Sequence, residues 1–165
     1  MPNIGEEYAL ESHLNQYMLL SKGLTKVDKK IEEFSKKTNS PILTIPEISH
    51  TSCITILAEI RCISNFNSVS KLTKYIDTPM HYESSQYEQR HSAITKKGNK
   101  YLRKMLYQVI TPVINNNKVF KDFYDKKISE GKSHRCAQGH CVRKLIRILF
   151  HILITGELID SAKLV

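Results

Sequence analysis

The chain has 165 residues, which is enough for one domain with a hydrophobic core but short for two. Hydrophobic residues make up 41% of it, an ordinary value for a globular protein, so the composition excludes a wholly disordered chain. The formal net charge of +9 predicts a polyanionic partner, most often nucleic acid. The alternative is a basic protein whose charge only keeps it in solution.

No amino-terminal stretch combines a charged start, a long apolar run and a small-residue cleavage site, so no secretory signal is expected. The most apolar stretch, residues 145–154, is too short to span a bilayer and contains Arg147 and His151. These features predict a cytoplasmic protein. Its cysteines are then expected to be reduced thiols; they are Cys53, Cys62, Cys136 and Cys141.

The first 40 residues form the first predicted region, a helical arm followed by a linker. Apolar residues recur at helical spacing over residues 8–34, with charged residues between them. The pattern fits a packing or dimerisation arm like a coiled coil, and equally a simple surface helix. Gly23 is expected to weaken or interrupt this helix, and the KKTNSP run at residues 36–41 to act as a linker or helix stop.

Residues 41–165 form the second predicted region, a compact helical domain. Apolar stripes predict helices over residues 51–63, 69–75, 99–115, 119–129 and 137–153. Asn99 is a candidate helix cap, and Pro112 is expected to bend or end its helix. Residues 79–91 are polar and aperiodic, which predicts a loop. Because no apolar–polar alternation typical of strands appears, the predicted fold class is all-α.

The most informative stretch is residues 82–103, which places two serines before a basic cluster and the start of a basic helix. Backbone N–H groups at a helix start, together with nearby lysines, suit a phosphate. A serine hydroxyl beside that phosphate could attack phosphorus if its proton were removed. From composition alone, a serine in a polar loop is more often only solvated.

Several segments in order resemble one family. They are Leu43-Thr44-Ile45-Pro46, Ile56-Leu57-Ala58-Glu59-Ile60, Asp77-Thr78-Pro79, Tyr82-Glu83-Ser84, Ile94-Thr95-Lys96-Lys97-Gly98-Asn99, Tyr101-Leu102-Arg103, Gly131-Lys132 and Val142-Arg143-Lys144-Leu145. In this order and spacing the chain resembles the carboxy-terminal domain of the bacterial insertion-sequence one-ten transposases, also named for the elements one-sixteen and nine-oh-two. The resemblance implies DNA transposition and a nucleoid-associated protein.

The resemblance also implies roles for individual residues. Ser84 aligns with the family's nucleophilic serine, which would form a covalent phosphoserine link to DNA; Ser85, in the place of the family's glycine, is the alternative. The residues expected to contact the backbone of DNA, or of a structured guide RNA, are Arg90, Lys96, Lys97, Lys100 and Arg103. Such contacts supply affinity and little sequence discrimination.

The family's Ile-Pro-Gly-Ile-Gly turn resembles a helix-hairpin-helix, a motif whose glycines let backbone N–H groups reach a phosphate. This chain has Ile45-Pro46-Glu47-Ile48-Ser49, with both glycines replaced and a carboxylate added. Since Glu47 would repel a phosphate, we expect a degenerate helix-hairpin-helix with a structural role.

The resemblance further implies a resolvase-like amino-terminal half, in which four carboxylates hold a divalent metal. The acidic residues before Ile42 lie on a helical pattern without the strands that such a site requires. We therefore expect a fragment with no cofactor of its own, inactive alone, whose metal belongs to the missing half. Its expected partners are DNA and a homo-oligomer or full-length transposase, with no membrane.

A cluster of two histidines and two cysteines lies just before the last predicted helix, at His134, Cys136, His140 and Cys141. The spacing fits neither a Cys-x-x-Cys knuckle nor a finger, so ordinary packing is favoured over a zinc site. Nearby, Arg143, Lys144 and Arg147 either extend a nucleic-acid surface or are only solvated.

Three hypotheses for the function remain open from the sequence. The first is a transposase fragment that is competent when complemented. The second is a non-catalytic nucleic-acid-binding or regulatory module, and the third is a decayed product without activity.

Overall fold

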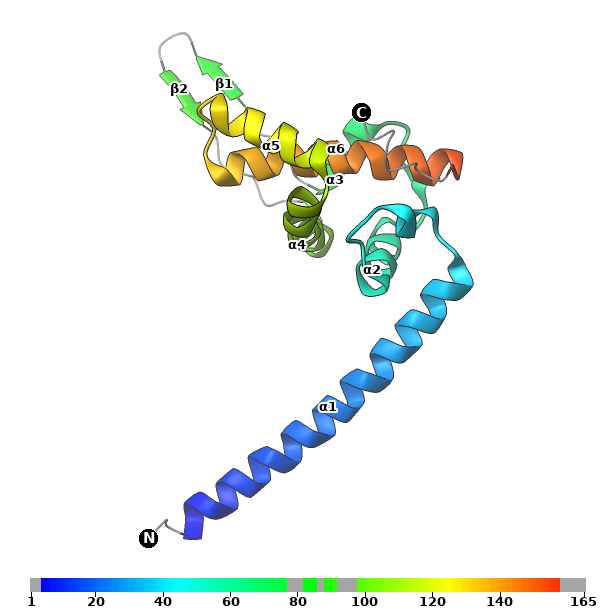
Figure 1. Cartoon of the computed structure of the whole chain (residues 1–165), viewed down its shortest axis with the longest axis vertical. Helices are drawn as coiled ribbons and strands as arrows, with labels where there is room; N and C mark the ends of the chain where they lie inside the picture. The colour runs from blue at the N-terminus through cyan, green and yellow to red at the C-terminus, as the bar shows by residue number, and fades with distance from the viewer. Residues whose placement is uncertain (1–3, 77–81, 86–87, 92–97, 158–165) are drawn as a thin grey trace.

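The computed structural model describes residues 4–76, 82–85, 88–91 and 98–157 (Figure 1). Over these residues the chain forms six α-helices, two short 3-10 helices and one two-stranded hairpin, which confirms the predicted helical fold class. No helix within the described ranges is both long enough and apolar enough to cross a membrane.

The first helix, α1 (Ile4–Thr38), is 35 residues long and projects from the rest of the protein as an arm (Figure 1). It runs without a break through Gly23, so the predicted interruption is wrong: a single glycine costs a helix only about 1 kcal/mol. The predicted linker at residues 36–41 is also shorter than expected. The helix continues to Thr38, and Asn39 leaves it with a left-handed φ of 41°.

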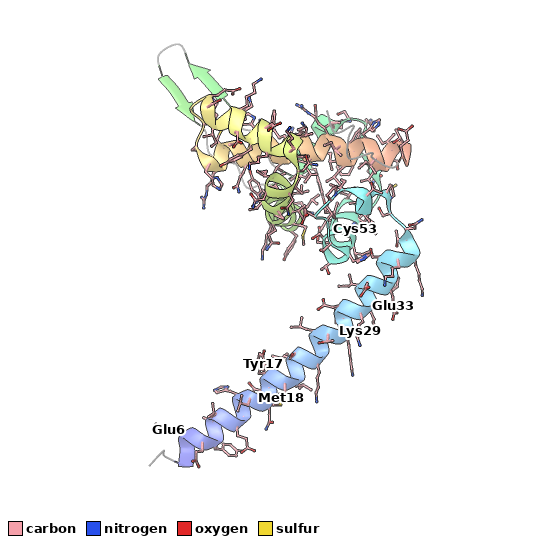
Figure 2. The ribbon with its side chains drawn as sticks, in the orientation of Figure 1. Glu6, Tyr17, Met18, Lys29, Glu33 and Cys53 are labelled. Carbon is pink, nitrogen blue, oxygen red and sulfur yellow. The ribbon has the colours of Figure 1, made fainter. Side chains whose placement is uncertain are left out.

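The arm meets the helical body only near its carboxy-terminal end, where α1 packs against α2 (His50–Ile60). Ser35 is buried there, and its Oγ lies 2.9 Å from Nδ1 of His50. All residues from 5 to 30 are exposed. Figure 2 shows the side chains of Tyr17 and Met18 on the free part of the arm, with no other element beside them.

A tight turn connects the arm to α2. The 3-10 helix η1 (Pro41–Thr44) is followed by Ile45 and Ile48, both buried, which anchor the turn in the core. Between them Glu47 is exposed and has a φ of 72°, in the left-handed region that glycine favours. Ser49 then caps α2, since its Oγ accepts a hydrogen bond from Ser52 N at 3.1 Å. This is the segment for which a degenerate helix-hairpin-helix was predicted; that prediction stays untested.

After α2 come a second 3-10 helix, η2 (Ile63–Asn65), and α3 (Val69–Ile76). The strands β1 (Tyr82–Ser85) and β2 (Glu88–His91) then pair antiparallel, with Ser84 opposite Gln89 and Ser85 opposite Glu88. The sequence predicted only a loop here. Each strand is only four residues long, too short to show the apolar–polar alternation that signals a strand.

The core is built by α4 (Lys100–Asn116), α5 (Lys118–Ser129) and α6 (His134–Thr155), with α2 and α3 packed against them. α6 is the central helix, because α3, α4 and α5 all contact it (Figure 1). Its fully buried side chains include Leu145 and Ile146, and those of α4 include Leu102, Leu106 and Ile110.

Of the two effects predicted for Pro112, a bend or an end of its helix, the structure excludes the end. Pro112 lies inside α4, and its buried neighbours Val109 and Val113 hold the helix in the core. α6 begins at His134, three residues before its predicted start, and ends at Thr155; Gly156 follows with a φ of 69° and forms the carboxy-terminal cap.

Candidate nucleic-acid interface

A positively charged groove lies between α4 and the first turns of α6. The cavity has a volume of about 640 Å³, and we call it the α4–α6 groove. Four of its lining residues are cationic, and none is a carboxylate. The lining residues are Lys100, Arg103, Lys104, Tyr107, Thr111, Ser133, Arg135, Cys136 and Gln138.

The amphipathic pattern of α4 explains its wall of the groove. Asn99 caps the helix, because its Oδ1 accepts hydrogen bonds from the backbone N–H groups of Tyr101 and Leu102, both at 3.0 Å. Burial of the apolar stripe in the core then turns the opposite face outward. That face carries Lys100, Arg103, Lys104, Tyr107 and Thr111, which recur every three or four residues.

The first turns of α6 supply the second wall. Ala137 is buried on the opposite side of the helix, while Arg135 and Gln138 line the groove. The two walls touch where Gln138 Nε2 donates a hydrogen bond to Thr111 Oγ1 at 3.3 Å. Packing of α4 against α6 thus brings Arg135 to the same cavity as Lys104, 31 residues earlier in the sequence.

The charge of the groove comes from side chains with different environments. Lys100, Lys104 and Arg135 are exposed, and Lys100 Nζ lies 5.0 Å from the centre of the Tyr101 ring. Arg103 is half-buried and donates from Nη1 to the carbonyl of Ile76 at 3.2 Å.

Tyr107 sits deeper between the two walls. Burial raises the pKa of its phenol above the usual 10, against the opposing effect of the nearby Arg143 and Arg103 charges. The hydroxyl is therefore protonated at neutral pH and can donate a hydrogen bond. A groove with several cations and neutral donors suits an anion such as a phosphate.

The residues predicted for the site fall in different places. Lys100 and Arg103 line the groove. Ser84 and Ser85 lie in β1 and Arg90 lies in β2, the strand that pairs with it. Lys96 and Lys97 lie outside the described residues. The structure therefore brings two of the predicted residues together.

Six polar residues of the groove were not among those predicted from the sequence. Lys104, Tyr107 and Thr111 share the helical spacing of Lys100 on α4 and could have been included on that ground. The others lie at the start of α6 and have no local signal that relates them to α4, because only the packing of α4 on α6 makes them neighbours; they are Ser133, Arg135 and Gln138.

The histidine–cysteine cluster is part of α6, and its members have other roles. Tyr124 Oη is hydrogen-bonded to His134 Nδ1 at 2.5 Å, and Cys141 is fully buried. Burial raises the pKa of the Cys141 thiol to about 11, so it is protonated at neutral pH. Within the described ranges, no three histidine, cysteine or acidic residues group as metal ligands would.

Of the three cations further along α6, two have packed surroundings. Lys144 Nζ lies over the rings of Phe120 and Phe123, at 5.4 and 5.3 Å from their centres, and Arg143 is half-buried. Arg147 is exposed. The aromatic contacts hold Lys144 against α5.

The family model described as Transposase IS116/IS110/IS902 family matches residues 39–125, which is more than half of the chain. The match covers α2, α3, the hairpin, α4 and most of α5, and hence the α4 wall of the groove. No curated protein sequence matches the chain.

Proposed function

The chain belongs to the IS116/IS110/IS902 transposase family, and we propose that it is the DNA-binding carboxy-terminal part of such a transposase. The observation that carries the proposal is the α4–α6 groove, in which four cationic side chains meet without a carboxylate. In this proposal the chain takes part in transposition together with a metal-binding half, and alone it binds DNA without reacting.

The groove supports binding to the nucleic-acid backbone. When exposed lysines and arginines neutralise phosphates, the counterions bound to the nucleic acid are released. This release supplies affinity that does not depend on the base sequence. Thr111, Gln138 and the protonated Tyr107 can donate to phosphate oxygens between the charges. A guide RNA has the same phosphate chemistry, so the proposal includes it as a second ligand of this groove.

The hairpin supports the covalent step. We assign the nucleophile to Ser84, with Ser85 as the alternative, on the resemblance of this segment to the family. The serine oxygen would form a bond to phosphorus while the bond from phosphorus to one deoxyribose oxygen breaks. The serine proton is transferred in the net reaction to the released sugar hydroxyl, so the products are a phosphoserine ester and a free DNA end.

Within the described residues no three histidine, cysteine or acidic side chains group together. No step is therefore assigned to a metal bound by this chain. In the proposal the metal belongs to the other half of the transposase, whose carboxylates would stabilise the charge that develops on the phosphate.

The arm supports a role in assembly. Heptad-spaced positions along α1 carry apolar residues at seven of eight places, the exception being His13; they are Leu10, Tyr17, Leu20, Leu24, Val27, Ile31 and Phe34. Leu20 and Leu24 are 67% and 64% exposed. Such a stripe is the seam of a coiled coil, and we assign it to self-association or to pairing with a full-length transposase.

The arm proposal is tested by placing charges in the seam. Replacing Leu20 and Leu24 by glutamate should shift the sedimentation profile from an oligomer to a monomer, because two charges in each helix would oppose burial of the seam. The far-UV circular dichroism of the body should be unchanged. An unaltered sedimentation profile would exclude this seam as the contact.

The catalytic proposal is tested by covalent capture of DNA. The chain is combined with the metal-binding half of a family member, and a labelled element end is added with magnesium. Ser84→Ala should abolish the protein–DNA adduct, whereas Ser85→Ala should leave it. The reverse pattern would assign the nucleophile to Ser85. DNA binding without an adduct in any protein, the unsubstituted one included, would support the non-catalytic module instead.

A further inference from the structure

The two chain positions on either side of the hairpin segment are held together by hydrogen bonds. Before the segment, α3 ends at Ile76; after it, α4 begins at Lys100. The backbone N–H of Asn99 donates to the carbonyl of Tyr75 at 2.8 Å. One helical turn into α4, Arg103 Nη1 donates to the carbonyl of Ile76 at 3.2 Å. The end of α3 and the start of α4 are thus joined directly.

The side chain of Asn99 extends this junction and uses all its hydrogen-bonding capacity. Its Oδ1 accepts from the two backbone N–H groups at the start of α4. Its Nδ2 therefore points the other way, and donates to Glu59 Oε2 at 2.7 Å and to Tyr75 Oη at 3.0 Å. The Tyr75 hydroxyl in turn donates to the carbonyl of Glu59 at 3.3 Å.

Glu59 is the member of this network that comes from outside the two joined helices. It lies on α2, 40 residues before Asn99, and its side chain is half-buried. The neighbouring residue Ile60 and the preceding Ile56 are buried in the core, which fixes the direction in which Glu59 leaves the helix. A carboxylate that accepts from an amide forms a stronger hydrogen bond than a neutral acceptor does.

We propose that Glu59 is a positioning residue: through Asn99, its carboxylate holds the end of α3 and the start of α4 together, and so fixes both ends of the segment that bears Ser84. The inference rests on the proposed function of that serine. Glu59 does not line the α4–α6 groove. Its replacement therefore leaves all four groove cations in the chain.

The main test is the covalent-capture reaction with variants of Glu59. Glu59→Ala should lower the adduct yield by about 10²-fold, the scale expected when a reacting group is displaced by about 1 Å. Glu59→Gln should lower the yield by less than about tenfold, because its amide oxygen can still accept from Asn99 as a neutral group. The DNA affinity of both variants should stay within about twofold of the original.

The matched control is Glu130→Ala, which removes a carboxylate that pairs with Lys127 at 2.7 Å in a different part of the body. Its adduct yield should equal that of the unsubstituted chain. If Glu59→Ala does not fold, as judged by circular dichroism, Asn99→Asp replaces it. That variant keeps the oxygen that caps α4 but replaces the amide donor by a carboxylate that repels Glu59, so it should also lower the adduct yield; an unchanged yield would overturn the positioning role.

A second measurement uses the chain alone and needs no reaction. Amide hydrogen exchange of Asn99 and Leu102 should be faster in Glu59→Ala than in the control, while the amide of the buried Leu145 should be unaffected. Equal exchange at Asn99 in the variant and the control would overturn the inference, because the junction would then not depend on Glu59.

The capture reaction also separates the two proposals. A normal adduct in the unsubstituted chain together with a normal adduct in Glu59→Ala would overturn the positioning role alone. Absence of any adduct in the unsubstituted, complemented chain would overturn the serine proposal, and the positioning role that rests on it would fall with it.

Discussion

Removing two cations from the α4–α6 groove should weaken DNA binding and flatten its salt dependence. Lys104 and Arg135 are the best pair to replace, because they are exposed and stand on opposite walls. The double variant Lys104→Gln, Arg135→Gln leaves Arg103 in place, whose hydrogen bond to Ile76 joins α3 to α4. The substitutions should therefore change charge and leave the fold intact.

The magnitude follows from the number of groove cations. If each of the four contacts one phosphate, the slope of log Kd against log salt is about 3.6, and about 1.8 in the double variant. Between about 50 and about 200 mM salt, the affinity of the unsubstituted chain should then fall about 150-fold, and that of the variant about 10-fold. Fluorescence anisotropy with a labelled duplex over this salt series measures both slopes.

The control must remove the same charge elsewhere. Lys22→Gln with Lys29→Gln on the exposed arm also lowers the formal net charge of +9 by two, and neither residue is near the groove. Its slope should stay near that of the unsubstituted chain. Equal slopes for the groove variant and the arm variant would exclude the groove as the binding site, because net charge and not the groove would then determine binding.

Three further outcomes concern stability. Glu47→Gly should raise the free energy of unfolding in urea by up to about 1 kcal/mol, since it relieves a left-handed backbone at an exposed position; a clear loss would show that Glu47 has an unrecognised contact. Leu106→Ala should lower the free energy of unfolding by about 2–5 kcal/mol, because Leu106 is fully buried, and Leu14→Ala on the arm should lower it by less than about 0.5 kcal/mol. Equal losses in the two variants would contradict the assignment of Leu106 to the core. Burial lowers the pKa of His140 below its usual 6.5, so the unfolded chain binds the proton first as the pH falls. The free energy of unfolding should therefore decrease as the pH falls below 6.5, and this decrease should be smaller in His140→Gln. Urea titrations at several pH values measure it; the same decrease in the variant and the unsubstituted chain would rule out His140 as the cause.

Local signals in the sequence were sufficient for much of the fold. Asn99 as a cap and the apolar stripe of α4 were both predictable, because capping and helical periodicity involve residues within a few positions of one another. At two positions the surroundings outweigh a local preference. Pro112 stays in a helix because buried neighbours hold it there, and Glu47 adopts a glycine-like φ because Ile45 and Ile48 are anchored on both sides.

The fold class, the basic charge and the family of this protein can be read from its sequence, since helical periodicity, composition and ordered motifs all lie along one chain. The meeting of Arg135 and Gln138 with the cationic face of α4, and the hydrogen bond between Glu59 and Asn99, are visible only in the folded protein. Those contacts depend on how the buried faces of distant helices pack together. Such packing leaves no repeating pattern in the sequence of either helix, so it cannot be read from one segment.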